Sequence, residues 1–127
     1  MTIDTLIDDL VLRVSSLGYA TYSIPAEHVS SVTEASFVTI TESDIEAEST
    51  EAYNFYILKA GIEVQIRSYA SEHEEALHTA QNIRNAVITV LNTYTDHQIL
   101  IQRITNTQAE KGHVQYTIEC IVQLPLT

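Results

Sequence analysis

The amino-acid sequence predicts an α+β fold, in which two helices pack on one face of a mostly antiparallel sheet. In two segments, 3–17 and 72–92, apolar residues recur at the three- and four-residue spacing of an amphipathic helix. Other segments alternate apolar and polar residues, as half-buried strands do: 37–41, 53–68, 99–105 and 114–124. This segregation of strands and helices along the chain favours a layered α+β domain.

The first helix is predicted from a single apolar stripe. Its members are Ile3, Leu6, Ile7, Leu10, Val11, Val14 and Leu17. Asp4 and Asp8 lie toward the N-terminus, where negative charge suits the helix dipole, and Gly18 is placed to end the helix. A short extended segment, 20–24, follows, and we expect 26–35 to be a loop.

An acidic stretch at 42–51 interrupts the strand pattern. It contains five carboxylates and no basic residue: Glu42, Asp44, Glu46, Glu48 and Glu51. We expect it to form an exposed hairpin loop or a frayed hairpin tip, because burying unpaired charges is costly. A solvated charge run is the simpler interpretation. The functional hypothesis is that these residues contact a basic surface on a partner.

The long strand 53–68 places apolar residues on one face at period two, while Gly61 indicates a bulge or a close backbone contact. The sequence from Ser71 to Glu74 has the pattern of a capping box that opens the second helix. Ile88 falls off the main stripe of that helix, and Ile121 lies on the mainly polar face of the last strand. We expect both isoleucines to be exposed and to contact a partner.

Length and charge limit the possible functions. The chain of 127 residues fits a single domain, 1–127, with 45% hydrophobic residues. Six Lys and Arg residues stand against 17 Asp and Glu residues, which gives a formal net charge of −11. Such a chain is poorly suited to bind nucleic acid or an anionic membrane. The start of the chain, from Met1 to Asp4, lacks the basic region of a secretory signal, so we expect the protein to be made in the cytoplasm.

The residues predict no catalytic or metal site, no cofactor and no enzyme activity. Cys120 lies in an alternating apolar run, which favours a buried, inert thiol. His73 and His78 are five residues apart, whereas the zinc-protease helix motif needs four, so exposed histidines are the expectation. Asp44 to Glu48 lacks the central glycine and closing glutamate of a calcium loop. Most of the seven tyrosines are expected to pack in or around the core.

The order and length of these elements resemble a known family. A helix leads into the hairpin 37–41 and 53–68, whose second strand, Ile62-Glu-Val-Gln-Ile-Arg-Ser68, runs into the helix that starts near Ser71-Glu-His-Glu-Glu-Ala-Leu77. A final hairpin, 99–105 with 114–124, closes the chain. This arrangement resembles the tail terminator, or tail completion, proteins of long-tailed bacteriophages and the related neck proteins. The resemblance covers nearly the whole chain and rests on no diagnostic motif.

The resemblance implies a structural virion protein at the junction of tail and neck. Such proteins form a homohexameric ring that caps the tail tube protein and joins it to the head connector, while DNA passes through without specific binding. An acidic ring suits that passage. The alternatives are another neck, head-closure or minor capsid protein, or a cellular acidic binding module that mimics DNA. The family has no catalytic residues, so none is transferred.

Overall fold

The computed structural model describes residues 3–24, 26–50, 55–94, 99–110 and 112–126. The helices are α1 (Ile3–Ser15) and α2 (His73–Asn92), with a 3-10 helix, η1 (Ala26–Ser31). The strands are β1 (Thr21–Tyr22), β2 (Ser36–Thr50), β3 (Phe55–Tyr69), β4 (Ile99–Glu110) and β5 (His113–Leu126). The predicted α+β class and the order of its elements are confirmed.

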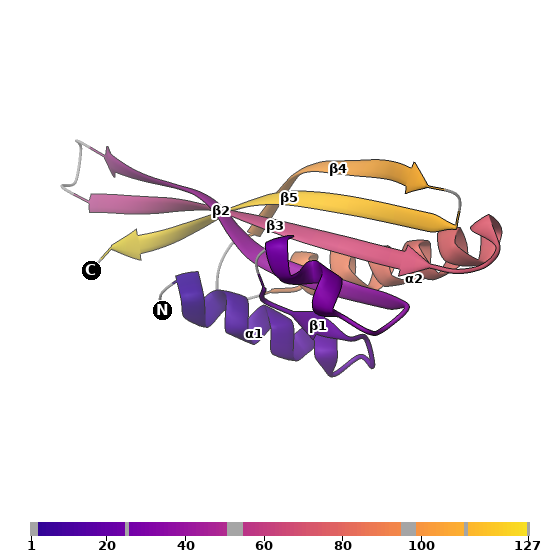
Figure 1. Cartoon of the computed structure of the whole chain (residues 1–127). Coiled ribbons are helices and arrows are strands. Elements are labelled where there is room, and N and C mark those ends of the chain that lie inside the picture. The colour runs from indigo at the N-terminus through magenta and orange to yellow at the C-terminus, as the bar shows by residue number, and fades with distance from the viewer. Residues whose placement is uncertain (1–2, 25, 51–54, 95–98, 111, 127) are drawn as a thin grey trace.

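The five strands form one sheet with the order β1-β2-β3-β5-β4. The short β1 pairs parallel with β2, and all other neighbours are antiparallel. The pairing of β3 with β5 brings together segments that are separated in sequence by the whole of α2 (Figure 1). Strands β1 and β4 therefore form the two edges of the described sheet.

Both helices pack against the same face of the sheet. The core is one cluster to which α1 contributes Leu6 and Leu10, and α2 contributes Ala80 and Ile83. Strands β2, β3 and β5 contribute even-numbered aliphatic residues, among them Val38, Ile40, Val64, Ile66 and Ile118, and β4 contributes Ile99. Fully burying one such side chain stabilises the fold by about 1.5–3 kcal/mol. We call the opposite surface, formed by the odd-numbered residues of β3 and β5, the helix-free face.

The strands extend past the helices at one end of the molecule. In Figure 1 the far part of β2 and the first part of β3 project beyond the N-terminal end of α1, together with the end of β5. We call residues 45–50 of β2 and 55–60 of β3 the hairpin arm. They are paired continuously, from Ile45 opposite Ala60 to Thr50 opposite Phe55. The arm is thus an extension of the sheet.

Three local predictions were wrong. The acidic stretch is not a loop as far as Thr50: it belongs to β2, because its alternating residues pair with β3. Part of the segment 26–35 forms η1. Helix α2 has Glu72 at its N-cap with no side-chain capping bond, so the serine of the predicted capping box stands one residue too early.

Two glycines have clear structural reasons. The register of β2 shifts between Glu42 and Ile45, so that two residues of β2 face Gly61 of β3, which confirms the predicted bulge. Gly112 has a φ of +84°, and a Cβ there would overlap the carbonyl oxygen of Ala70. Since the Ala70 amide donates a 2.9 Å hydrogen bond to the Gly112 carbonyl, the β4–β5 turn is held against the start of α2.

Candidate interaction surfaces

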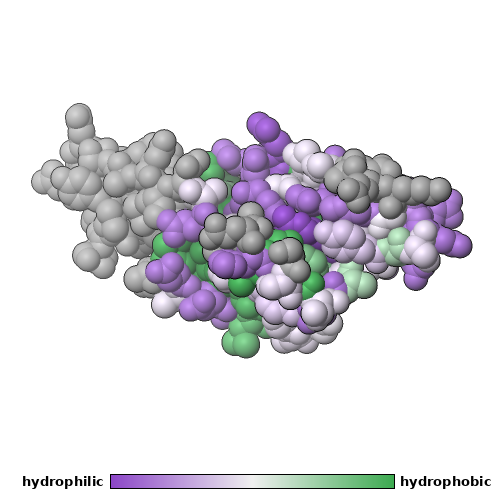
Figure 2. Space-filling model, in the orientation of Figure 1, coloured by the Kyte–Doolittle hydropathy of each residue, from purple (hydrophilic) through white to green (hydrophobic). Residues whose placement is uncertain are grey.

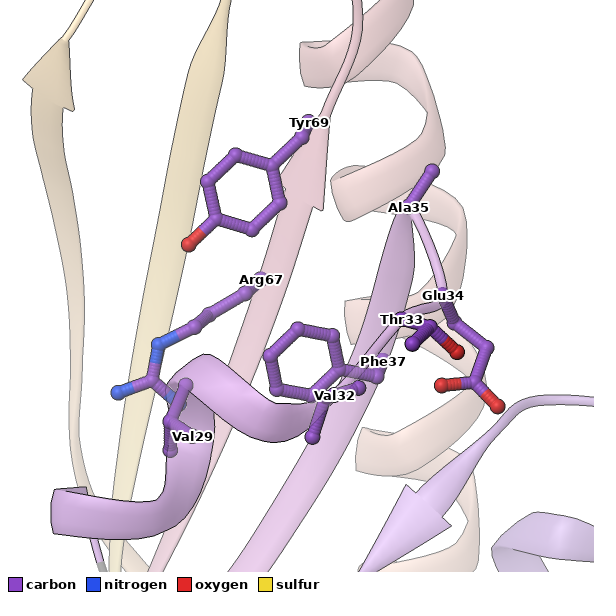
Figure 3. Close-up of a pocket in the computed structure, with 8 residues that line it drawn as sticks. All are labelled: Val29, Val32, Thr33, Glu34, Ala35, Phe37, Arg67 and Tyr69. Atoms are coloured by element: carbon purple, nitrogen blue, oxygen red, sulfur yellow. The ribbon is translucent and has the colours of Figure 1, made fainter.

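A pocket of about 580 Å³ lies on the helix-free face, between η1 and the sheet. Val29 and Val32 form one wall, while Phe37 of β2 and Arg67 and Tyr69 of β3 form the floor and the other side (Figure 3). The pocket exists because the chain after β1 crosses over the sheet before it enters β2. Residues from three separate segments therefore converge on one arginine.

Arg67 is 9% exposed and is the only buried charged residue in the described part of the chain. Its Nη1 donates a 3.5 Å hydrogen bond to Thr39 Oγ1, and its Nη2 donates to Gln65 Oε1. Gln65 in turn donates a 2.8 Å bond to Glu63 Oε1. The direct hydrogen-bond partners of the guanidinium, Thr39 and Gln65, are thus neutral. The carboxylate of Glu63 is linked to Arg67 only through Gln65.

The environment of Arg67 is poorly suited to an isolated charge. Burial lowers the pKa of the Arg67 guanidinium, although Tyr69 and Glu63 partly oppose this. The guanidinium carbon lies 5.9 Å from the centre of the Phe37 ring, which gives weak cation–π attraction. Beside it, Tyr69 stacks on His113 with ring centres 4.2 Å apart. The site therefore combines aromatic walls with an incompletely compensated cation.

The rim of the pocket carries a second polar contact. The Tyr22 hydroxyl donates a 2.5 Å hydrogen bond to Glu34 Oε1. This bond raises the pKa of Tyr22 and lowers the pKa of Glu34. In Figure 3 the Glu34 carboxylate points away from the guanidinium of Arg67, toward the other side of the pocket. Glu34 is consequently committed to Tyr22 and does not neutralise Arg67.

The rest of the helix-free face is largely polar. Across β3, β5 and β4 the register places Glu63, Glu119 and Arg103 in one row, and Arg103 Nε lies 3.6 Å from Glu119 Oε2. Both side chains of this ion pair are exposed, so it contributes little stability. Beyond this row lies a small apolar area, where Leu100 of β4 stands opposite Ile121 of β5. This face is more suited to contact than to core formation.

The carboxylates predicted to form a contact surface lie along one strand. Glu42 is exposed and ends the first part of β2, just before the bulge. Asp44, Glu46 and Glu48 belong to the second part of β2. In the backbone register, Glu46 stands opposite Lys59 of β3 and Glu48 stands opposite Ile57. Glu51 lies outside the described residues. Whether these residues contact a partner stays a prediction.

The two isoleucines predicted to be exposed are half-buried. Ile88 of α2 packs against the core cluster. Ile121 lies on the helix-free face beside Gly61 and Leu100, as the strand pattern indicated. Both are therefore less exposed than predicted, and their contact with a partner stays a prediction.

The periodicity of apolar residues in the sequence did not predict several exposed apolar side chains. Leu12 on α1 is 67% exposed, and apolar surface gathers over α1 in Figure 2. Leu17 was expected in the buried stripe but is 52% exposed, since α1 ends at Ser15 and the chain turns away. Ile104 is 44% exposed on the edge strand β4, although a register shift between Ile101 and Arg103 places it opposite the buried Ile118. The shift leaves no sign in the sequence.

Cys120 has the environment that was expected. It is buried in the core, and burial raises the pKa of its thiol to about 12. A neutral thiol is a weak nucleophile and a poor metal ligand. Among the described residues, no three His, Cys, Asp or Glu side chains gather as they would around a metal ion. In the same part of the chain, no helix is both long and apolar enough to cross a membrane.

Comparisons with known proteins give a structural likeness. No protein-family model matches the amino-acid sequence, and no curated protein sequence matches it. A chain in the solved structure of the virion of a native gene transfer agent (GTA) particle superposes with a TM-score of 0.64 at 13% sequence identity. The match covers 89% of this chain and 84% of that chain. The single-sheet, two-helix fold described above is therefore shared with a chain from a virion particle.

Proposed function

We propose that this protein is a structural component of a phage-like virion and, within the virion, the tail terminator. Copies of the chain form a six-membered ring that caps the tail tube and joins it to the head connector. The observation that carries this proposal is the fold shared, over nearly the full length of both chains, with a chain of a virion particle. The order of elements in the sequence adds the narrower assignment to the terminator.

The described surfaces support a role in assembly. The molecule offers a polar helix-free face, a projecting hairpin arm, and two exposed leucines, Leu12 on α1 and Leu17 just after it, all of which can contact other proteins. Partly exposed apolar residues and a pocket around an arginine are features of protein interfaces. The formal net charge of −11 lets DNA pass through a ring without adhering.

Native mass spectrometry and electron microscopy test the proposal together. The purified protein, alone and mixed with tail tubes of its own particle, is expected to give six-fold rings and to cap one end of each tube. Tubes polymerised with the protein should be of limited length, while tubes without it continue to grow. Rings that bind the connector but ignore the tube would assign the chain to another neck position. A protein that remains monomeric with both partners would refute the structural role.

A further inference from the structure

We propose that the Arg67 pocket receives a carboxylate from the hairpin arm of a second copy of this chain, with Glu48 as the principal donor and Glu46 as the next. This contact deepens the proposed ring, and it rests on that proposed function. It would make the ring a series of identical contacts, each joining the arm of one copy to the pocket of the next.

The pocket offers unused hydrogen-bond donors. A guanidinium has five N–H groups, and Arg67 donates one bond to Thr39 and one to Gln65. Its remaining donors are available to a planar carboxylate, which matches the fork geometry of arginine with two parallel bonds. Apolar side chains of Val29, Val32 and Phe37 line the approach. Such walls exclude water and strengthen the attraction between opposite charges.

The negative net charge of the chain explains why contact between two copies would need a buried arginine. Two copies that each carry a net charge of −11 repel one another at long range, so their contact has to depend on local pairing. Of the other arginines, Arg13 is paired with Asp9, and Arg103 lies near Glu119. Arg84 lies over the Tyr116 ring at 4.9 Å and bonds to Asn85. Among the four arginines, Arg67 alone combines burial with a pocket open to a ligand.

The arm and the pocket lie at opposite ends of the same hairpin. Phe37 is near the start of β2, and Glu46 is separated from it by about 30 Å of extended strand. One copy therefore cannot fill its own pocket. A site at one end of a molecule and its ligand at the other produce a head-to-tail contact, which is the type that closes into a ring.

The register places the acidic positions on the appropriate face. Glu46 and Glu48 pair with Lys59 and Ile57, which are odd-numbered positions of β3, like Arg67. Residues two apart along a strand share a face, so both glutamate positions belong to the helix-free face. Glu46 stands opposite a basic residue in its own hairpin, whereas Glu48 stands opposite an isoleucine. Glu48 is accordingly the position with no basic residue opposite it in the hairpin.

A mixing experiment with two defective variants tests the contact. The pocket variant is Arg67→Gln, and the arm variant combines Glu46→Gln and Glu48→Gln. Analytical ultracentrifugation and native mass spectrometry would compare their self-association with that of the unchanged protein. Each variant alone is expected to associate about 30-fold more weakly or worse, as when one partner of a buried charge pair is removed. An equimolar mixture is expected to form 1:1 dimers that do not close, because each pair retains one intact arm and one intact pocket.

The control is Arg84→Gln, which removes an arginine that also lies against an aromatic ring but does not line the Arg67 pocket. It should form rings as the unchanged protein does. Circular dichroism and thermal unfolding show whether each variant is folded. If Arg67→Gln does not fold, the arm variant alone decides, since Glu46 and Glu48 are register positions of the helix-free face. Its addition to unchanged protein should then terminate rings.

The outcomes separate this contact from the proposed function. If the unchanged protein forms rings and both variants form them equally well, the arm–pocket contact is wrong while the terminator proposal stands. If the variants behave as expected but no ring binds a tail tube, the contact stands and the terminator proposal fails. If the unchanged protein never self-associates, the second copy is not the occupant, and the contact is refuted.

Discussion

The two faces of the sheet are built on different principles. On the helix-covered face, Val64 and Ile66 of β3 are fully buried in one cluster with apolar and aromatic side chains of both helices and the other strands. On the helix-free face, the alternate residues Glu63, Gln65 and Arg67 of the same strand bond to one another. Burial of apolar area determines the first face, and directional polar bonds determine the second. One strand thus contributes both to stability and to a surface available for contact.

The largest expected effect comes from truncating the covered face. Ile66→Ala should lower the free energy of unfolding by about 2–5 kcal/mol, because it removes buried methyl groups and leaves a cavity that the sheet cannot close. Urea unfolding followed by circular dichroism measures the change. The matched variant on the other face, Thr117→Ala, should cost less than about 1 kcal/mol. Equal costs would break the comparison between the faces.

A smaller effect is expected for Arg67→Met, which keeps most of the buried side-chain volume. The loss of hydrogen bonds to Thr39 and Gln65 is offset by the removal of a desolvated charge, so unfolding should change by less than about 2 kcal/mol. Chemical denaturation provides the measurement. If Arg67→Met lowered the free energy of unfolding as much as Ile66→Ala does, Arg67 would serve mainly to stabilise the fold and not to bind a ligand.

A smaller change in the free energy of unfolding is expected for Cys120, which also lies on the covered face. Cys120→Ala should cost about 1 kcal/mol, since the side chain is small. The thiol should not react with a disulfide reagent at pH 8, because its pKa of about 12 leaves almost no thiolate and the sheet excludes the reagent. The same reagent should titrate the thiol at once in denaturant. Rapid reaction of the folded protein would show that the core opens.

The smallest effect concerns a polar contact in the helix layer. Tyr94 donates a 2.6 Å hydrogen bond to Asp9 Oδ2, and Arg13 donates a 3.0 Å bond to the same atom. The Tyr94 bond and, less strongly, Arg13 hold the pKa of Asp9 below its usual value. This contribution to stability is present above the unfolded pKa of about 3.9 and is lost as pH falls through the lowered folded pKa.

Tyr94→Phe should therefore lessen the loss of stability at acid pH. Thermal unfolding between pH 6 and pH 2 would show a shallower decline for the variant than for the unchanged protein. Tyr19→Phe provides a control, since the Tyr19 hydroxyl is not bonded to Asp9. An acid decline that is identical in all three proteins would remove Asp9 from the explanation.

The covered face could be predicted from sequence in most of its detail. Leu6, Leu10 and Val14 recur at helical spacing, and Ile62, Val64 and Ile66 at strand spacing, because each set is buried along one side of a regular element. The ends were less accurate: α1 stops at Ser15, before the expected Leu17, and β4 continues to Glu110. Ends depend on local caps and neighbouring strands, which periodicity does not encode.

The pocket could not be predicted in the same way. It depends on where the segment from Val29 to Val32 crosses the sheet, and this segment has neither strand nor helix periodicity. The polar alternation of Glu63, Gln65 and Arg67 indicated a solvent-facing side and gave no sign that Arg67 is buried. Burial of that arginine is a tertiary effect of η1 on a distant strand. From the sequence, only the alternation of polar and apolar residues along this strand could be predicted.

The bulge in β2 changes which residues of the strand, even- or odd-numbered, lie on the helix-covered face. Before it, even-numbered residues such as Val38 and Ile40 occupy the covered face, and after it Ile45 and Ala47 share that face with Ala60 and Leu58. With the inserted residue counted, the even-numbered acidic positions lie on the side away from the helices. Deleting Ser43 would restore simple alternation by leaving Asp44 alone opposite Gly61, while Ile45 and Ala47 keep their partners Ala60 and Leu58. The pairing beyond the bulge therefore fixes the face of the acidic positions, and the extra residue can be lost without moving them to the other face.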